Sequence, residues 1–178
     1  SKGHCGPRQI GEYRHLMRIF LASLALATLS ACGLSPMYAG GGSGAVAQSL
    51  AAIEVAPIEG RAGWLVRSAL EERFAAAGNP APRYRIDIRL DDRLEGLAIL
   101  RDDTISRERR TLRARYQLTD LSTGEIVLDA TDGSDAGIDV VSSEYAVIAA
   151  EQTALENLSQ DLAQRIVTRV ALALRNQR

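Results

Sequence analysis

The 178-residue chain carries 21 Lys and Arg residues against 22 Asp and Glu residues, and 46% of its residues are hydrophobic. Its formal net charge of −1 argues against general nucleic-acid binding, which requires an excess of basic residues. The histidines and the lysine all lie within the first fifteen residues, so the rest of the chain lacks the commonest general base, a Schiff-base lysine and histidine ligands for zinc.

An apolar run over residues 19–27 follows the basic Arg18 and leads into the pentapeptide LSACG at residues 29–33. A basic residue, an apolar stretch and small residues before a cleavage site are the parts of an export signal. A cysteine at this place is typical of a bacterial chain that is acylated on the sulfur and cleaved just before it. We therefore predict that Cys32 is lipidated and becomes the first residue of the exported protein.

Residues 17–31 thus form a predicted lipoprotein signal peptide, and residues 1–16 a predicted extension ahead of a start at Met17. The apolar stretch is well short of the roughly 20 residues that a membrane-spanning helix needs, which favours lipid anchoring. Acyl chains on Cys32 bind a membrane surface with about 0.8 kcal/mol per buried methylene. Residues 32–51, rich in Gly and Ser, are predicted to be a flexible linker behind this anchor.

Beyond the cleavage site the chain keeps 17 basic and 21 acidic residues, so it is mildly acidic. Cys32 is the one cysteine left, which excludes an internal disulfide. Residues 83–115 hold ten arginines and seven acids, whereas residues 116–164 hold ten acids and no Lys or Arg. We expect one part of the domain to carry a positive field and another a negative one.

The first predicted element is a short strand over residues 53–58, where apolar and polar residues alternate and Pro57 closes the run. An amphipathic helix is predicted over residues 63–77, because apolar residues from Leu65 to Phe74 recur about one turn apart. A Gly-Asn-Pro sequence directly after it predicts its end.

Three further strands are predicted from a period of two in the apolar residues. Their expected inward residues are Tyr84, Ile86, Ile88 and Leu90, then Leu112, Ala114, Tyr116 and Leu118, then Ile126, Leu128 and Ala130. Residues 97–110 are expected to form a long hairpin arm between the first two strands, which favours an antiparallel meander. We expect the outward arginines of these strands to pair with Asp87 or Asp129: Arg85, Arg89, Arg113 and Arg115.

A long helix is predicted from Ser143, its N-cap, to Asn176, with Leu, Ile and Val residues three or four apart on one face. The order β-α-β-β-β-α predicts an α+β fold over residues 52–178. In this two-layer sandwich, two helices pack on a four-stranded, mainly antiparallel sheet.

A scattered set of residues carries a family resemblance over essentially all of the chain after Cys32. They are Gly33, Pro36, Met37, Tyr38, Ile53, Val55, Pro57, Ile58, Arg61, Gly63, Arg67, Leu70, Tyr116, Gln117, Leu118, Asp120, Thr123, Gly124, Tyr145 and Ala146. With the order of the elements, this set resembles the LptE family of lipopolysaccharide-assembly lipoproteins. The resemblance implies a lipoprotein on the periplasmic side of the Gram-negative outer membrane. It further implies that the protein plugs the LptD β-barrel, assists its assembly and binds lipopolysaccharide on its way to the outer leaflet.

The resemblance also implies lipopolysaccharide-binding residues at Arg107, Arg109 and Arg110, because a basic position in the family's hairpin falls near Arg109. Guanidinium groups pair with phosphate in bidentate geometry, which suits the phosphates of lipid A. A second basic position of the family, early in the last helix, has no counterpart here, since Ala149 and Ala150 stand in that region.

Three alternatives stay open. The hairpin arginines can instead pair with Asp102, Asp103 and Glu108 on a solvated surface. An auxiliary periplasmic lipoprotein of an ABC transporter can share the same order of elements. A lipid-anchored hydrolase that uses carboxylates alone is disfavoured by the missing His, Lys and free Cys, so the sequence predicts no enzyme, no cofactor and no metal site.

Overall fold

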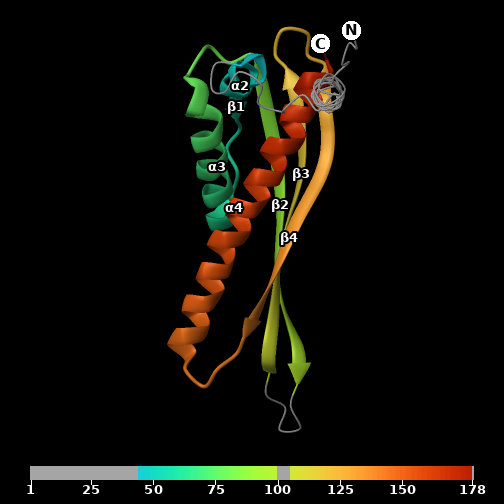
Figure 1. Ribbon diagram of the computed structural model, residues 1–178. Helices are drawn as coiled ribbons and strands as arrows, with labels where there is room; N and C mark the ends of the chain where they lie inside the picture. Colours follow the sequence, from blue (N-terminus) through green and yellow to red (C-terminus); the bar gives the residue numbers. More distant parts are fainter. Residues whose placement is uncertain (1–43, 100–104, 178) are drawn as a thin grey trace, which may run out of the picture. The chain divides into compact units, whose positions relative to one another are not determined.

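Four strands and three α-helices make up the part of the chain that the structure describes (Figure 1). The computed structural model describes residues 44–99 and 105–177, which lie in the compact unit Met37–Arg178. Cys32, the predicted signal peptide and the hairpin residues 100–104 lie outside the described residues. The elements are α2 (Ala45–Ala51), β1 (Ile53–Val55), α3 (Gly60–Phe74), the 3-10 helix η2 (Ala75–Ala77), β2 (Tyr84–Ile99), β3 (Ile105–Asp120), β4 (Ile126–Asp139) and α4 (Glu144–Asn176).

The sheet has the strand order β1-β2-β3-β4, with β1 and β4 at its two edges. The last three strands form the predicted antiparallel meander, in which Leu118 lies opposite Ile86 on one side and Leu128 on the other. β1 runs parallel to β2, with Ile53 opposite Tyr84, because α3 carries the chain back along the sheet between them. The predicted α+β class and element order are confirmed, but the sheet is mixed rather than mainly antiparallel.

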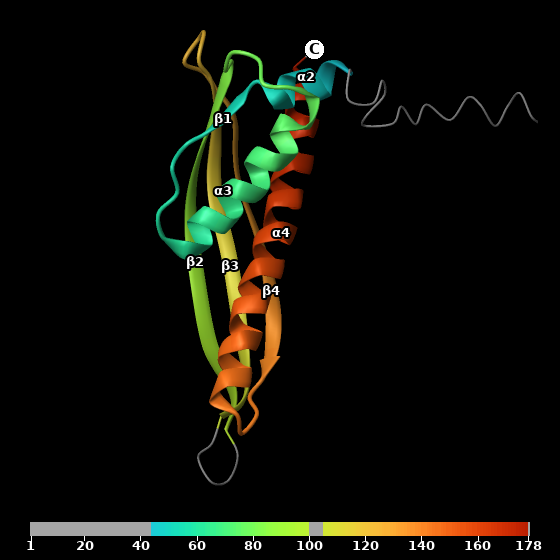
Figure 2. The same cartoon turned by 90° about the vertical axis from the view of Figure 1, so that its left-hand side faces the viewer.

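The core lies between the sheet and the helices α3 and α4, which cover one of its faces (Figure 2). The inward residues predicted for β2 and β3 are buried, except that Leu90 is half-buried. The prediction for Ile126 is wrong, because this side chain is exposed. A register shift between Leu118 and Thr119 places Ile126 opposite the outward Thr119. The alternation of inward and outward residues along β4 therefore changes by one residue here, and Ile126 points outward.

α4 contributes the longest buried stripe. Its start after Ser143 and its end at Asn176 are as predicted, although the Ser143 side chain makes no capping hydrogen bond. Burial of each Leu, Ile or Val side chain contributes about 1.5–3 kcal/mol, so this stripe is a large part of the stability of the domain. The buried apolar residues of α4 are Ala154, Leu155, Leu158, Leu162, Ala163, Ile166, Val167, Val170, Ala171 and Leu174.

Two segments differ from expectation in their extent. The last residues of the predicted linker form the helix α2, whose Leu50 and Ala51 are buried against the core. The arm predicted over residues 97–110 belongs mostly to two long strands, since β2 continues to Ile99 and β3 starts at Ile105. Backbone pairing therefore continues well beyond the part of the sheet that α3 and its apolar contacts cover.

Gly63 permits the close approach of α3 to the chain before it. A Cβ atom at this position would lie 2.6 Å from the carbonyl oxygen of Ile58, which is too close for any side chain. We expect Gly63→Ala to lower the free energy of unfolding by about 1–3 kcal/mol, because the backbone must move apart. Urea unfolding measures this loss, and Ser68→Ala on the exposed side of α3 is the control, with an expected change within about 0.5 kcal/mol.

Candidate functional site

The arginines predicted to bind lipopolysaccharide all lie on β3, but the alternation of the strand separates them. Arg110 is in phase with the buried Leu112 and faces the helices, whereas Arg107 and Arg109 lie on the opposite, outer face of the sheet. The structure therefore brings two of the three side chains to one surface and places the third beneath α4.

The Arg110 side chain forms hydrogen bonds both to the sheet and to α4. Its Nη2 and Nε atoms donate hydrogen bonds to the carboxylate of Asp92 at 2.7 and 2.9 Å, and Nη1 donates to the backbone carbonyl of Glu151 at 3.1 Å. The side chains of Arg110 and Asp92 are only 16% and 26% exposed. The hydrogen bond with Asp92 raises the pKa of Arg110 above its ordinary value, although burial acts against this. Arg110 thus fixes the early part of α4 to the sheet.

Glu108, an expected ion-pair partner of the arginines, also lies on the helix-facing side of β3. Its neighbours across the strands are Gly96 of β2 and Ile138 of β4. Its Oε2 atom is buried and has no hydrogen-bond partner among the described residues. Asp102 and Asp103, the other expected partners, lie outside the described residues.

Arg107 and Arg109 pair instead with aspartates of the neighbouring strand β4. The Nε atom of Arg107 lies 3.3 Å from Asp139 Oδ1, and the Nε atom of Arg109 lies 4.0 Å from Asp135 Oδ2. The two arginine side chains are 61% and 53% exposed. Such exposed pairs contribute only about 0–1 kcal/mol, so both guanidinium groups remain available to an anion from solvent.

The rest of the outer face carries mostly charged and polar side chains. Arg115 pairs with Asp129 across the strands at 3.2 Å, as predicted, whereas Arg85 pairs with Asp87 of its own strand at 3.4 Å. Hydrogen bonds from Gln117 and then Arg115 lower the pKa of Asp129. The outer face therefore carries alternating charges rather than an apolar surface.

A hollow of about 560 Å³ opens on this face between β2, β3 and the loop after β1. Within it, Arg89 lies directly opposite Arg115 on the neighbouring strand. Among the described residues, Arg89 and Arg113 have no carboxylate within ion-pair distance. Because like charges face each other here, the outer face has positive charge that an anion can neutralise. Its lining residues are Ala56, Pro57, Asp87, Ile88, Arg89, Arg115, Tyr116 and Gln117.

A polar network on the other face connects β3, β4 and α4. The buried Tyr116 hydroxyl donates a hydrogen bond to Asp132 Oδ2 at 2.5 Å, and Arg169 Nη2 donates to Asp132 Oδ1 at 2.8 Å. Burial, and then the hydrogen bond to Asp132, raise the pKa of Tyr116 well above its ordinary value. Residues of this network were not among the predicted site residues, because nothing in the sequence pairs positions so far apart.

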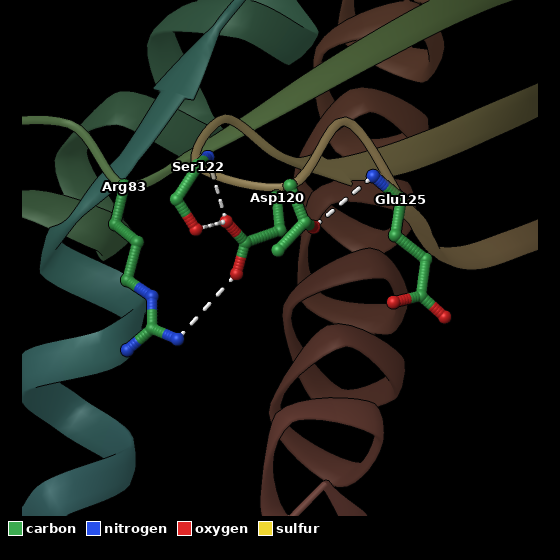
Figure 3. Close-up of polar contacts among 5 residues, drawn as sticks. Arg83, Asp120, Ser122 and Glu125 are labelled. Atoms are coloured by element: carbon green, nitrogen blue, oxygen red, sulfur yellow. Dashed lines mark hydrogen bonds and ion pairs between the residues drawn. The ribbon is translucent and has the colours of Figure 1, made fainter.

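The turn between β3 and β4 is organised by Asp120, whose carboxylate faces Ser122 and Arg83 (Figure 3). It accepts hydrogen bonds from the backbone N–H of Ser122 at 2.8 Å and from its hydroxyl, and one from Arg83 Nη2 at 3.4 Å. The Asp120 backbone N–H donates to the carbonyl of Glu125 at 2.9 Å. The hydrogen bonds from Ser122, with a smaller effect of Arg83, lower the pKa of Asp120.

This pKa gives the turn a predictable response to acid. A carboxyl group whose pKa is lowered by folding stabilises the folded state above its ordinary pKa, about 3.9, and this stabilisation is lost as the pH falls. We expect the free energy of unfolding to decrease below about pH 4, and Asp120→Asn to flatten that decrease. Thermal unfolding between pH 2 and 7 measures both curves, and equal slopes for the two proteins would contradict the assignment.

The described residues contain neither a cluster of potential metal ligands nor a helix suited to spanning a membrane. No group of three or more His, Cys, Asp or Glu side chains lies within reach of one metal ion in residues 44–99 and 105–177. In the same residues, no helix combines the length and the apolar character needed to cross a bilayer.

Comparisons with known proteins identify relatives of this fold. The chain matches the model of the LptE family, described as lipopolysaccharide-assembly, over residues 50–170. No curated protein sequence matches the chain.

Solved structures resemble the domain over most of its length. A protein assigned as a lipoprotein in Caulobacter crescentus CB15 is 23% identical, with a TM-score of 0.63, covering 76% of this chain and 98% of its own. Rare lipoprotein B from Shewanella oneidensis is 11% identical, with a TM-score of 0.56, covering 70% and 96%. A minor lipoprotein from Acinetobacter baumannii is 12% identical, with a TM-score of 0.52, covering 67% and 90%. At these identities the likeness is one of fold.

Proposed function

The chain belongs to the LptE family of lipopolysaccharide-assembly proteins, and on that premise we propose that it is a lipid-anchored outer-membrane factor for an LptD-type β-barrel. In this proposal it assists assembly of the barrel, plugs it and contacts lipopolysaccharide during delivery to the outer leaflet. The anchor is the acylated Cys32, and the domain faces the periplasm. It acts without catalysis and without a cofactor.

The family match over residues 50–170 carries this proposal. It includes the whole sheet, α3 and most of α4, so it concerns the folded domain rather than a shared signal peptide. This favours barrel assembly over the auxiliary role in an ABC transporter. The sequence left that role open because both kinds of protein share an order of elements.

We place the contact with lipopolysaccharide on the outer face of the sheet, at Arg107 and Arg109. Both side chains are exposed, so their ion pairs with β4 can be exchanged for phosphate contacts. Arg110 completes the predicted set, but its donors already bind Asp92 and Glu151, so we expect it to contribute less to binding.

Reversal of the two outer charges tests this contact. We expect Arg107→Glu with Arg109→Glu to weaken binding of purified lipopolysaccharide about tenfold or more, because each lost charge-assisted bond is worth about 1.5–3 kcal/mol. The control is Arg165→Glu with Arg175→Glu, which makes the same charge change at exposed positions of α4. Equal losses of lipopolysaccharide affinity in both double variants would show that net charge alone causes the effect.

Depletion in the organism of origin tests the assembly role itself. We expect lipopolysaccharide to disappear from the cell surface and to accumulate inside the cell envelope as the protein is depleted. Surface labelling with a lipopolysaccharide-specific antibody, with total lipopolysaccharide as the reference, measures this. Unchanged surface labelling after complete depletion would contradict the proposed function.

A further inference from the structure

The two edges of the sheet differ in how they are protected. β1 is three residues long and is followed by Pro57, so it offers little backbone to a neighbour. β4 is fourteen residues long, contains no Pro or Lys, and pairs with β3 alone among the described strands. Its pairing is regular from Leu128 to Asp139. One backbone edge of β4 is therefore a long template for another strand (Figures 1 and 2).

A groove runs between the end of β4 and the first half of α4. It has a volume of about 590 Å³ and lies between residues 135–139 of the strand and residues 149–161 of the helix. Short side chains line the helix side of this groove, so the side chains of an added strand have room above the sheet. They are Ala149, Ala150, Thr153, Ala154 and Asn157.

The charge of this surface selects the kind of strand that fits. All lining residues come from the segment 116–164, which has no Lys or Arg. Asp161 at the rim forms no ion pair with the described residues. Asp135 and Asp139 have only the exposed partners Arg109 and Arg107. A second copy of β4 would set aspartates against aspartates, whereas a basic strand would set cations against them.

We propose that the free edge of β4, with the groove beside α4, binds an extended basic segment of a partner protein as a fifth strand. Main-chain hydrogen bonds to β4 supply affinity. Lys or Arg side chains on the helix-facing side of the added strand reach Asp161, and those on its other side lie near Asp135 and Asp139. The inference does not depend on lipopolysaccharide binding, since it rests on the backbone edge of β4 and on Asp161, and neither belongs to the proposed contact at Arg107 and Arg109.

Peptide binding to the full chain tests the proposal. The probe is a fluorescent nine-residue peptide of alternating Lys and Val, and two matched peptides replace Lys by Glu or carry an N-methyl group on every residue. We expect the Lys-Val peptide to bind at least about tenfold more tightly than either, because one control reverses the charge and the other removes main-chain donors. Equal binding of the N-methylated peptide would exclude strand addition.

Substitutions on α4 locate the site. We expect Asp161→Lys to weaken the Lys-Val peptide about fivefold or more, while Glu156→Lys, an exposed acid of the same helix outside the groove, changes binding less than about twofold. Hydrogen exchange of the unmodified chain gives a second measurement, with protection expected at β4 amides and not at β1. Peptide-induced protection elsewhere in the chain would overturn the proposal. Protection of β4 that rises with protein concentration in the absence of peptide would also overturn it and would indicate self-association instead.

Discussion

Replacement of Arg110 by alanine should lower the free energy of unfolding by about 1–3 kcal/mol and loosen the first turns of α4. The guanidinium group makes two bonds to Asp92 and one to the Glu151 carbonyl in a largely buried position. Its removal leaves that carboxylate and that carbonyl without their partner. Apolar burial cannot compensate, because the buried stripe of α4 begins only at Ala154.

Urea unfolding and hydrogen exchange measure this effect together. Arg109→Ala is the matched control, since it removes the neighbouring arginine, whose one ion pair is long and exposed. We expect that variant to lie within about 0.5 kcal/mol of the unmodified protein. Faster exchange of amides in residues 147–153 in the Arg110 variant alone is the expected pattern. Equal loss of stability in both variants would show that Arg110 has no special place in the fold.

Tyr116→Phe should also destabilise the domain by about 1–3 kcal/mol, because Asp132 loses a buried hydrogen-bond donor. It should also change the response to alkali. A tyrosine whose pKa is raised by folding stabilises the folded state below its ordinary pKa of about 10. That stabilisation is lost as the pH rises further, because the unfolded chain ionises first.

Denaturant unfolding at a series of pH values from 7 to 12 tests this assignment. We expect the free energy of unfolding of the unmodified protein to decrease above about pH 10 and that of Tyr116→Phe to decrease less steeply. Tyr84→Phe is the control, since the Tyr84 side chain is also buried but donates no hydrogen bond to a described residue. Parallel curves for Tyr116→Phe and the unmodified protein would contradict the effect of the Tyr116 hydroxyl.

Regular apolar patterns in the sequence were sufficient to predict the elements that build the core. The long stripe of α4 predicted its bounds, and the alternation from Tyr84 to Leu90 predicted the buried side of β2. The lengths of β2 and β3 were underestimated at the ends next to their connecting hairpin. Charged residues occupy both faces of the sheet there, so no apolar alternation marks the strands. Asp92 and Arg110 occupy inward positions in phase with core residues, and their mutual bonds replace apolar contacts.

The candidate site was harder to predict because ion-pair partners depend on register. Neighbours in sequence such as Glu108 and Arg109 point to opposite faces of a strand, so proximity along the chain did not give the pairs. The partners of Arg107 and Arg109 lie on β4, about thirty residues away in sequence. Asp92 and Arg110 stand at positions that continue the inward alternation of β2 and β3. This was the signal in the sequence that could have distinguished the inward Arg110 from the outward Arg107 and Arg109.

The central claim is that this domain functions as a lipid-anchored part of a complex with an outer-membrane β-barrel. Affinity purification of the full-length tagged chain from detergent-extracted membranes, followed by mass spectrometry of the eluate, tests it most directly. We predict that a large outer-membrane β-barrel protein co-purifies in about equal amount. Recovery of the chain alone, or together with an inner-membrane permease, would contradict the claim.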